Sequence, residues 1–253
     1  MIFLRFRFQD EARYGIVDRH QVTPISPDPF SSFQEEDESI PLSQVRILAP
    51  VLPSKIVAVG INYKAHAREM GHELPSEPVL FLKPASSVIG SSETIVYPKM
   101  AAQVDYEAEL AVVIKKTAKN ISAESAPDHM LGYTCMNDVT ARDLQKKDGQ
   151  WTRAKGFDTF SPLGPWVVTD LDVSDLPVES YLNGELRQKG NTRDMIFGIP
   201  YLVSFISRVM TLLPGDVITT GTPPGIGPMR PGDEVDVRIE GIGVLRNTVE
   251  AES

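Results

Sequence analysis

Three carboxylate side chains, Glu107, Glu109 and Asp138, are the residues of this sequence best suited to chemistry. Glu107 and Glu109 lie in the apolar run 104–114, which is typical of a strand, and side chains two apart on a strand project from one face. Asp138 closes the next apolar run and could supply a third oxygen. Carboxylates that face an interior repel each other and lose hydration, and a cation between them would offset both costs. The alternative is a solvated strand face with ordinary surface acids.

The ligand types also indicate which cation such a site would hold. An all-oxygen set favours Mg²⁺, Mn²⁺ or Ca²⁺ over Zn²⁺. A zinc hydrolase is disfavoured because the sequence has four scattered histidines and one cysteine. That cysteine, Cys135, lies in an apolar run, so a buried thiol is a simpler interpretation than a nucleophile.

His66 and Glu69 form a second candidate group. They lie in the segment 60–71, which indicates a strand end that enters a short helix. Residues three apart on a helix share a face, so the two side chains can form a hydrogen bond. A histidine oriented by a carboxylate is a common general-base pair. The alternative is an exposed salt bridge on the helix surface.

Three further polar residues could bind an anionic substrate: Lys155, Arg142 and Thr222. Lys155 lies among aromatic and small residues, and a partly buried lysine needs an anionic partner, which the carboxylates would provide. Arg142 follows Asp138 by one helical turn and could clamp a substrate carboxylate or, equally, pair with a nearby acid. Thr222 lies in a glycine-containing loop whose backbone N–H groups can approach an anion closely.

Composition narrows the class of protein. The net charge of −9 argues against nucleic acid and against an anionic membrane as partners. No apolar run approaches the roughly 20 residues needed to span a bilayer. The single cysteine excludes an internal disulfide and fits a reducing cytoplasm, so we expect a cytoplasmic protein.

The elements that must position these residues are mainly strands. We expect a small N-terminal β module over residues 1–53 and a main domain over 54–253, because prolines interrupt the chain just before the apolar run that begins near residue 55. One helix is predicted from Pro200, with an apolar stripe that continues to Leu213. A hairpin is predicted at the C-terminus, from strands over 234–240 and 244–250.

In combination and in this order, these motifs resemble the fumarylacetoacetate hydrolase family. The resemblance covers about residues 54–250. The stretches that carry it are Gly-Ile-Asn-Tyr from position 60 with His66 and Glu69, Phe-Leu-Lys-Pro from 81, Asp-Tyr-Glu-Ala-Glu-Leu from 105, Gly-Tyr from 132 with Asn-Asp-Val-Thr-Ala-Arg-Asp from 137, Lys-Gly-Phe-Asp from 155, and Gly-Thr-Pro from 221. The chain departs from fumarylacetoacetase itself, which has a much longer N-terminal domain. It therefore looks like the short bacterial branch of the family.

The resemblance implies an α+β fold that is mainly β, with mixed packed sheets or β-rolls and few short helices. It implies a homodimer, and Mg²⁺ or Mn²⁺ held by Glu107, Glu109 and Asp138. His66 and Glu69 would be the catalytic pair on a lid helix. Further residues would act in the substrate pocket: Lys155 as a catalytic residue, and Arg142 and Thr222 as substrate-binding residues.

The activity expected from the resemblance is metal-dependent chemistry on a small anionic 2-oxo acid. C–C bond hydrolysis of an acylpyruvate through an enolate is favoured slightly, because His66 and Glu69 are both present. Two alternatives stay open. One is the isomerase/decarboxylase of homoprotocatechuate catabolism, which acts on 2-hydroxyhepta-2,4-diene-1,7-dioate or 5-oxopent-3-ene-1,2,5-tricarboxylate, and the other is oxaloacetate decarboxylase. A metal-stabilised binding domain is the non-enzymatic alternative.

Overall fold

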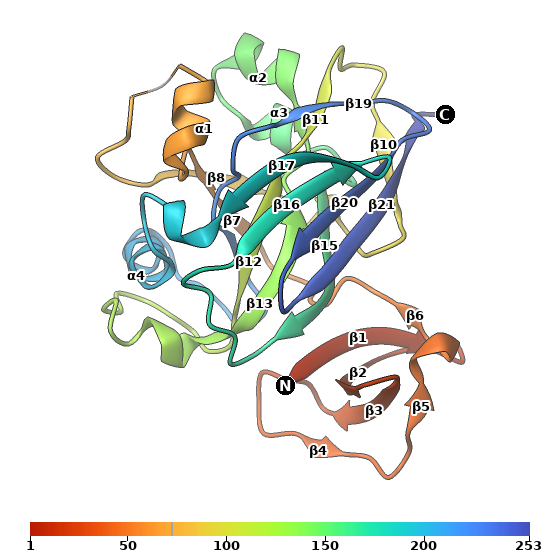
Figure 1. Ribbon diagram of the computed structural model, residues 1–253. Coiled ribbons are helices and arrows are strands. Elements are labelled where there is room, and N and C mark those ends of the chain that lie inside the picture. The colour runs from red at the N-terminus through yellow and green to blue at the C-terminus, as the bar shows by residue number, and fades with distance from the viewer. Residues whose placement is uncertain (72) are drawn as a thin grey trace.

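The computed structural model describes residues 1–71 and 73–253, and its N-terminal strands form a small antiparallel layer beside the main body (Figure 1). Leu4 and Phe6 point into the interior of this layer and pack with Val22 and Ile40, which gives the module its own buried cluster. Its elements are β1 (Ile2–Phe8), β2 (Glu11–Asp18), β3 (Gln21–Ser26), β4 (Gln34–Glu35), β5 (Ile40–Pro41), the 3₁₀ turn η1 (Leu42–Gln44) and β6 (Arg46–Ile47).

The module is not separated from the rest of the chain by hydrogen bonding. Strand β1 pairs antiparallel with β15 (Ser161–Val168), and Ile2 lies opposite Val168. The N-terminal layer is therefore continuous with the large sheet of the main domain. A domain boundary near residue 53 stays a prediction.

The large sheet carries the central strands of the molecule. From β15 it continues through β13 (Met130–Asn137), β12 (Ala108–Ile114), β18 (Val217–Thr219), β7 (Ile56–Gly60) and β8 (Val79–Lys83), with β9 (Val88–Ile89) paired to β15. Strand β18 is distant in the sequence from both of its neighbours, β12 and β7. Every residue of β12 is buried, because both faces of this strand are covered. Such a strand lacks the alternation of a half-exposed one and is a nearly continuous apolar run.

Two smaller sheets complete the β structure. The five-stranded sheet has the order β10 (Thr94–Tyr97), β21 (Gly243–Ala251), β20 (Glu234–Ile239), β16 (Pro177–Leu182), β17 (Glu185–Asn191). Leu110 of β12, Val237 of β20 and Leu245 of β21 belong to one buried cluster, so this sheet packs on a face of the large one. The predicted C-terminal hairpin is formed by β20 and β21. The three-stranded sheet is β14 (Thr140–Ala141), β11 (Val104–Tyr106), β19 (Gly227–Met229).

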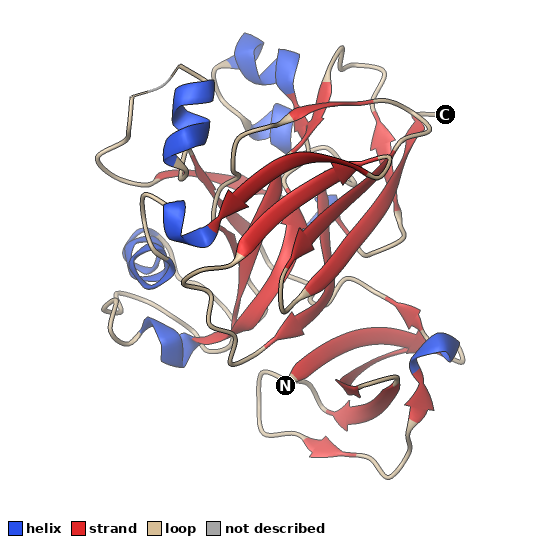
Figure 2. Ribbon diagram, viewed as in Figure 1, coloured by secondary structure: helices blue, strands red, loops and turns tan. Residues whose placement is uncertain are grey.

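The helices are short and lie around the strands (Figure 2). They are α1 (Lys64–Glu69), α2 (Arg142–Asp148), α3 (Thr152–Lys155) and α4 (Ile199–Val209), with 3₁₀ turns η2 (Ala85–Ser87), η3 (Ala126–His129) and η4 (Thr192–Asp194). The prediction that the helical stripe reaches Leu213 is wrong. Helix α4 ends at Val209, and Leu212 instead exchanges backbone hydrogen bonds with Ala118, at 2.9 and 3.0 Å.

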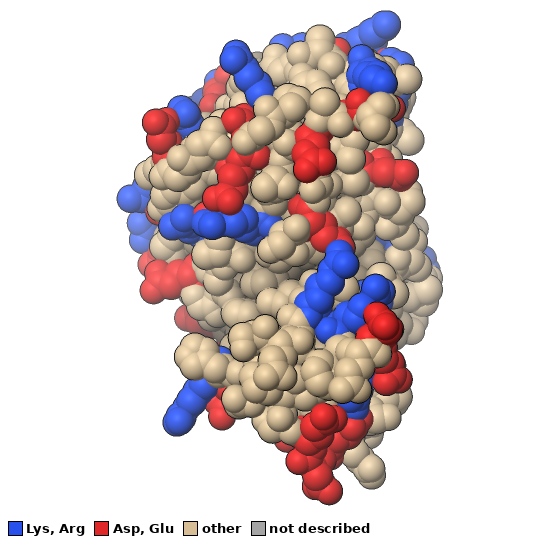
Figure 3. Space-filling view, turned by 90° about the vertical axis from the view of Figure 1, so that its right-hand side faces the viewer, with Lys and Arg blue, Asp and Glu red and all other residues tan. Residues whose placement is uncertain are grey.

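The expected fold class, mainly β with packed sheets and few short helices, is confirmed. No helix in the described part of the chain is long and apolar enough to cross a membrane. On the face seen in Figure 3, small groups of acidic and basic side chains are separated by larger areas of other residues.

Candidate active site

Glu107 lies where the chain passes from one sheet to another. The single strand predicted over 104–114 is wrong, because β11 ends at Tyr106 and β12 begins at Ala108. Side chains replace the missing strand partner at this break. The Glu107 N–H donates to Asn137 Oδ1 at 2.9 Å, and the Ala108 N–H donates to Gln188 Oε1 at 2.9 Å. The break keeps the backbone hydrogen-bonded while it places the buried Glu107 side chain in the wall of a cavity.

Glu109 and Asp138 converge with Glu107. Glu109 is the second residue of β12, and Asp138 directly follows β13, whose Asn137 is paired with Ala108. The Asp138 N–H donates to the Glu107 carbonyl at 2.8 Å, which fixes the two acids beside each other. One carboxylate oxygen from each of the three buried acids lies within 4.8 Å of the others. The sequence expectation that the three acids meet is confirmed.

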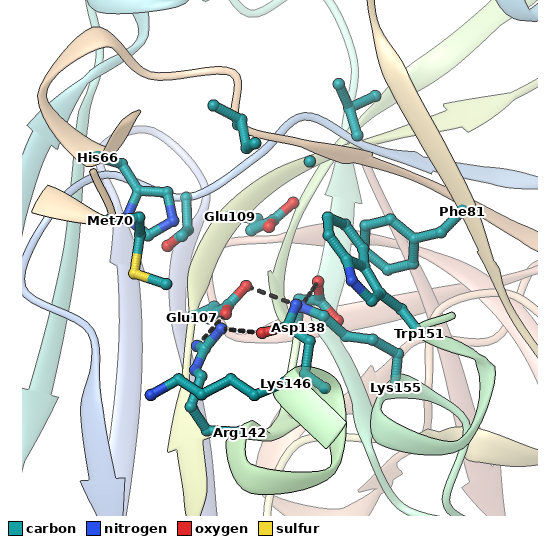
Figure 4. Close-up of a pocket in the computed structure, with 15 residues that line it drawn as sticks. His66, Met70, Phe81, Glu107, Glu109, Asp138, Arg142, Lys146, Trp151 and Lys155 are labelled. Carbon is teal, nitrogen blue, oxygen red and sulfur yellow. Dashed lines mark hydrogen bonds and ion pairs between the residues drawn. The ribbon is translucent and has the colours of Figure 1, made fainter. Parts of the chain in front are cut away.

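Buried cations lie against two of these acids (Figure 4). Lys155 Nζ donates to Glu107 Oε2 at 2.9 Å and to Asp138 Oδ2 at 2.6 Å. Lys83 Nζ lies 2.6 Å from Asp138 Oδ1. The Arg142 guanidinium contacts Glu107 and donates from Nε to Asp105 Oδ2 at 2.8 Å. Lys155 therefore has the carboxylate partners expected from its apolar sequence context.

Arg142 pairs with nearby acids, which was one of the two roles that the sequence left open for it. Its two ion pairs, with Asp105 and Glu107, occupy Nε and one terminal nitrogen, and Nη1 donates to Gln145 Oε1 at 2.6 Å. The side chain also lines the cavity. That it additionally holds a substrate carboxylate stays a prediction.

Glu109 differs from its two neighbours. Among the described residues, no lysine, arginine or histidine nitrogen lies within 4.0 Å of its carboxylate, which accepts a hydrogen bond from the Gly221 N–H at 2.8 Å. Burial and the negative charges of Asp138 and Glu107 raise the pKa of Glu109 well above its usual range. Burial alone would also raise the pKa of Glu107, but Lys155 and Arg142 outweigh it and lower that pKa.

The donor set fits a hard divalent cation. Three carboxylates supply only oxygen ligands, and one of them, Glu109, is a buried acid with no cationic partner in the described chain. Such an acid is stabilised by a cation or is protonated. Glu107, Glu109 and Asp138 would together hold the ion.

His66 and Glu69 lie on α1, on one side of the same cavity. His66 Nδ1 is 3.0 Å from Glu69 Oε2, as the three-residue spacing predicts. The other carboxylate oxygen, Oε1, accepts a hydrogen bond from the Gly225 N–H at 2.9 Å. Glu69 therefore joins α1 to the glycine-containing loop and orients the imidazole of the buried His66 at the same time.

The turn into α1 is held by side-chain hydrogen bonds. Ile61 has a φ of +55°, a left-handed conformation that is rare for a β-branched residue. The next residue, Asn62, donates to the carbonyls of Phe197 and Thr220 and accepts from the Phe197 N–H. These three bonds fix the backbone that carries α1 over the cavity.

Thr222 is a wall of the cavity whose hydroxyl is already engaged. Its Oγ1 donates to the Ala108 carbonyl at 2.9 Å and accepts from Gln188 Nε2 at 2.7 Å. Gln188 thus joins the loop to the start of β12. The role of Thr222 in binding substrate stays a prediction.

The cavity that unites these groups has a volume of about 310 Å³. Its polar side is formed by the three acids with Arg142 and Lys155, and His66 lines it from α1. Phe81 and Trp151 form an aromatic wall, with ring centroids 5.1 Å apart. A small anionic molecule with a short carbon chain fits this distribution of charged and apolar side chains.

Sequence reasoning missed three residues of the site: Lys83, Asp105 and Gln188. Lys83 is the last residue of the apolar strand β8 and is fully buried. A lysine at the end of an apolar run could have indicated a buried cation that pairs with an acid of the site. Asp105 and Gln188 gave no comparable signal, because their partners Arg142 and Thr222 are distant in the sequence.

The chain matches a known family over most of its length. The model described as fumarylacetoacetate (FAA) hydrolase C-terminal matches residues 55–250, and the model described as Rv2993c-like, N-terminal, matches residues 1–50. Human mitochondrial oxaloacetate tautomerase is 41% identical over 263 residues, which cover 93% of this chain and 84% of that protein.

Solved structures show the same fold with several activities in their names. The 5-carboxymethyl-2-hydroxymuconate delta-isomerase from Mycobacterium smegmatis is 46% identical, with a TM-score of 0.94 and 100% of both chains covered. Maleylpyruvate hydrolase from Sphingobium sp. SYK-6, solved in complex with manganese(II) and pyruvate, is 31% identical, with a TM-score of 0.83 and 100% of both chains covered. These relatives are enzymes whose named reactions are isomerisation, tautomerisation and hydrolysis.

Proposed function

The chain belongs to the fumarylacetoacetate hydrolase family, and from this premise we propose that it is a divalent-metal-dependent enzyme that acts on small 2-oxo acids. The reaction we propose first is keto–enol isomerisation, the transfer of a proton between C3 and the 2-oxo oxygen. The observation that carries this proposal is the convergence of the three acids, Lys155 and His66 on one cavity. The similarity to an oxaloacetate tautomerase and to an isomerase supports the choice of reaction.

The proposed metal ligands are Glu107, Glu109 and Asp138. A bound Mg²⁺ or Mn²⁺ would act as a Lewis acid that stabilises negative charge on the 2-oxo oxygen. The manganese in the maleylpyruvate hydrolase structure supports a divalent ion in this family.

His66 is the proposed acid–base residue. Its Nδ1 is held by Glu69, which leaves Nε2 to exchange a proton. Nε2 removes a proton from C3 of the keto form, and the electron pair of the broken C–H bond shifts so that the 2-oxo oxygen becomes negative. Transfer of this proton from Nε2 to the oxygen gives the enol and restores the neutral imidazole, and the reverse sequence restores the keto form. The hydrogen bond from His66 to the Glu69 carboxylate fixes the orientation of the imidazole ring for this proton transfer.

Charge counting supports an anionic substrate. The buried acids Asp105, Glu107, Glu109 and Asp138 contribute −4, and the buried cations Lys83, Arg142 and Lys155 contribute +3, which leaves −1. A divalent ion would bring the site to +1. A site of that charge attracts a carboxylate, whereas the same groups without the ion carry no net positive charge.

C–C bond hydrolysis of an acylpyruvate is the second candidate. It is favoured by the His66–Glu69 hydrogen bond, since such a pair can remove a proton from water while the resulting hydroxide adds to the distal carbonyl. The C–C bond would then break, and its electron pair would pass to the pyruvate fragment as an enolate. The similarity to maleylpyruvate hydrolase supports this reaction.

One set of assays tests both reactions. Protein stripped of metal with a chelator is assayed with Mg²⁺ or Mn²⁺ on enol-oxaloacetate, on acylpyruvates and on an unsaturated 2-hydroxy dioate. Enol absorbance, pyruvate and CO₂ are measured separately, with metal-only samples to subtract uncatalysed tautomerisation and decarboxylation. We expect metal-dependent loss of the enol band without release of pyruvate. Pyruvate formed from an acylpyruvate would favour hydrolysis, and no metal-dependent rate on any of these substrates would contradict the proposal.

A further inference from the structure

Lys146 differs from the other cationic residues of the cavity. Lys155 and Arg142, which also line it, each pair with a buried acid, and the buried Lys83 pairs with Asp138. Lys146 also lines the cavity but is exposed at its rim, and among the described residues no carboxylate oxygen lies within 4.0 Å of its Nζ. Its charge is therefore available to a ligand.

Helix α2 explains why Lys146 faces the cavity. Arg142 and Lys146 are four residues apart, so they lie on one face of the helix, and Arg142 reaches Glu107 from that face. Lys147, one residue further, is turned by about 100° and does not line the cavity. In Figure 4, the Lys146 side chain extends from α2 toward the side of the cavity where Met70 and His66 lie.

We propose that Lys146 binds the distal carboxylate of the substrate, so that the enzyme prefers 2-oxo diacids to 2-oxo monoacids. This inference rests on the proposed function. With a divalent ion, the buried groups sum to +1, which one carboxylate neutralises. Lys146 adds a second positive charge at the rim, where a second carboxylate of the same molecule would lie.

The shape of the cavity is consistent with this arrangement. The acids lie deep in the cavity, and Phe81 and Trp151 form an apolar wall on the other side from Met70 (Figure 4). A short carbon chain can contact this wall while its two ends meet the buried polar groups and Lys146. The cavity volume of about 310 Å³ is at the lower end for small-molecule sites and suits a compact diacid.

A pair of unreactive analogues separates charge from size. Malate is the hydroxy analogue of oxaloacetate. In 2-hydroxybutyrate, a methyl group replaces the distal carboxylate of malate. Binding of both is measured by calorimetry with Mg²⁺ present, for the wild-type protein and for Lys146→Met. We expect the substitution to weaken malate binding about fivefold, because an ion pair at a partly exposed rim is modest in strength, and to leave 2-hydroxybutyrate binding unchanged. Lys147→Met is the matched control and should change neither, while Lys146→Arg should restore malate binding.

A kinetic measurement accompanies the binding experiment. For oxaloacetate we expect Lys146→Met to raise KM by a similar factor with little change in kcat, since the residue binds the end that does not react. If Lys146→Met weakened the binding of malate and of 2-hydroxybutyrate equally, or did not weaken malate binding, the proposed role of Lys146 would be overturned. Metal-dependent turnover by the wild-type protein would still support the proposed function. If the wild-type protein neither binds malate nor turns over any 2-oxo acid, both proposals fail.

Discussion

The two sides of the cavity are built differently. The carboxylate side belongs to the large sheet, where Glu109 lies in a fully buried strand and Asp138 directly follows its neighbour. The other side is α1, a helix of six residues that carries His66 and is tied to the opposite loop by Glu69. One side is thus fixed by strand pairing, and the other by a few side-chain contacts.

This difference implies a division of labour that mutations can separate. Changes in the acid cluster should abolish metal binding and therefore turnover. Changes on α1 should slow proton transfer while the metal still binds, because no residue of α1 is among the three clustered acids. Four predictions test this division, and they are ordered from the largest expected effect.

Glu109→Gln should reduce metal-dependent turnover at least about 1000-fold, because the loss of a charged ligand removes most of the Lewis-acid stabilisation. The fold should survive, since the amide has the same shape and the acid has no cationic partner among the described residues. Turnover is measured with excess Mn²⁺, and circular dichroism checks folding. Glu250→Gln, at an exposed position of β21, is the control. Wild-type turnover by Glu109→Gln would remove this residue from the metal site.

His66→Gln should slow isomerisation roughly 100- to 1000-fold, the range typical of a lost general acid–base group. Metal affinity should stay unchanged. The rate is measured from the enol absorbance of oxaloacetate, and His20→Gln, in an exposed turn of the N-terminal module, is the matched control. An equal fall in metal affinity would show that the two sides of the cavity are not separable.

Glu69→Gln should have a smaller effect, about tenfold on kcat, because the amide can still accept a hydrogen bond but no longer stabilises a protonated His66. The rate is measured from the enol absorbance of oxaloacetate, as for His66→Gln. A kcat equal to that of the wild type would argue that Glu69 only fastens α1 to Gly225.

The metal-free protein should lose stability as pH rises. The pKa of Glu109 is raised in the folded state by burial and by its acidic neighbours, so above its ordinary value of 4.5 the folded protein binds more protons than the unfolded chain. The free energy of unfolding should then fall by up to about 1.4 kcal/mol per pH unit until the raised pKa is passed. Urea titrations in chelator measure this slope. Glu109→Gln should flatten it, and an unchanged slope would assign it to other groups.

The sequence predicted the fold class, and it predicted some of the contacts in the site but not the backbone that makes them. Local spacing predicted the His66–Glu69 bond. The approach of Asp138 to Glu107 and Glu109 depends on the pairing of β12 with β13, so the full set of three acids was expected from the family resemblance and not from spacing alone. The strand break at Glu107 could not be foreseen, since it depends on Gln188 and Asn137, which reach the backbone from other strands. The end of α4 could not be foreseen either, because Leu212 exchanges backbone hydrogen bonds with Ala118, which is distant in the sequence.

Direct titration with Mn²⁺, followed by electron paramagnetic resonance, tests the central claim that the three buried acids hold a divalent ion. The wild-type protein should bind one Mn²⁺ per chain, displaceable by Mg²⁺, and Glu109→Gln should lose at least about 100-fold in affinity. Absence of stoichiometric binding by the wild-type protein, or equal binding by the variant, would contradict it.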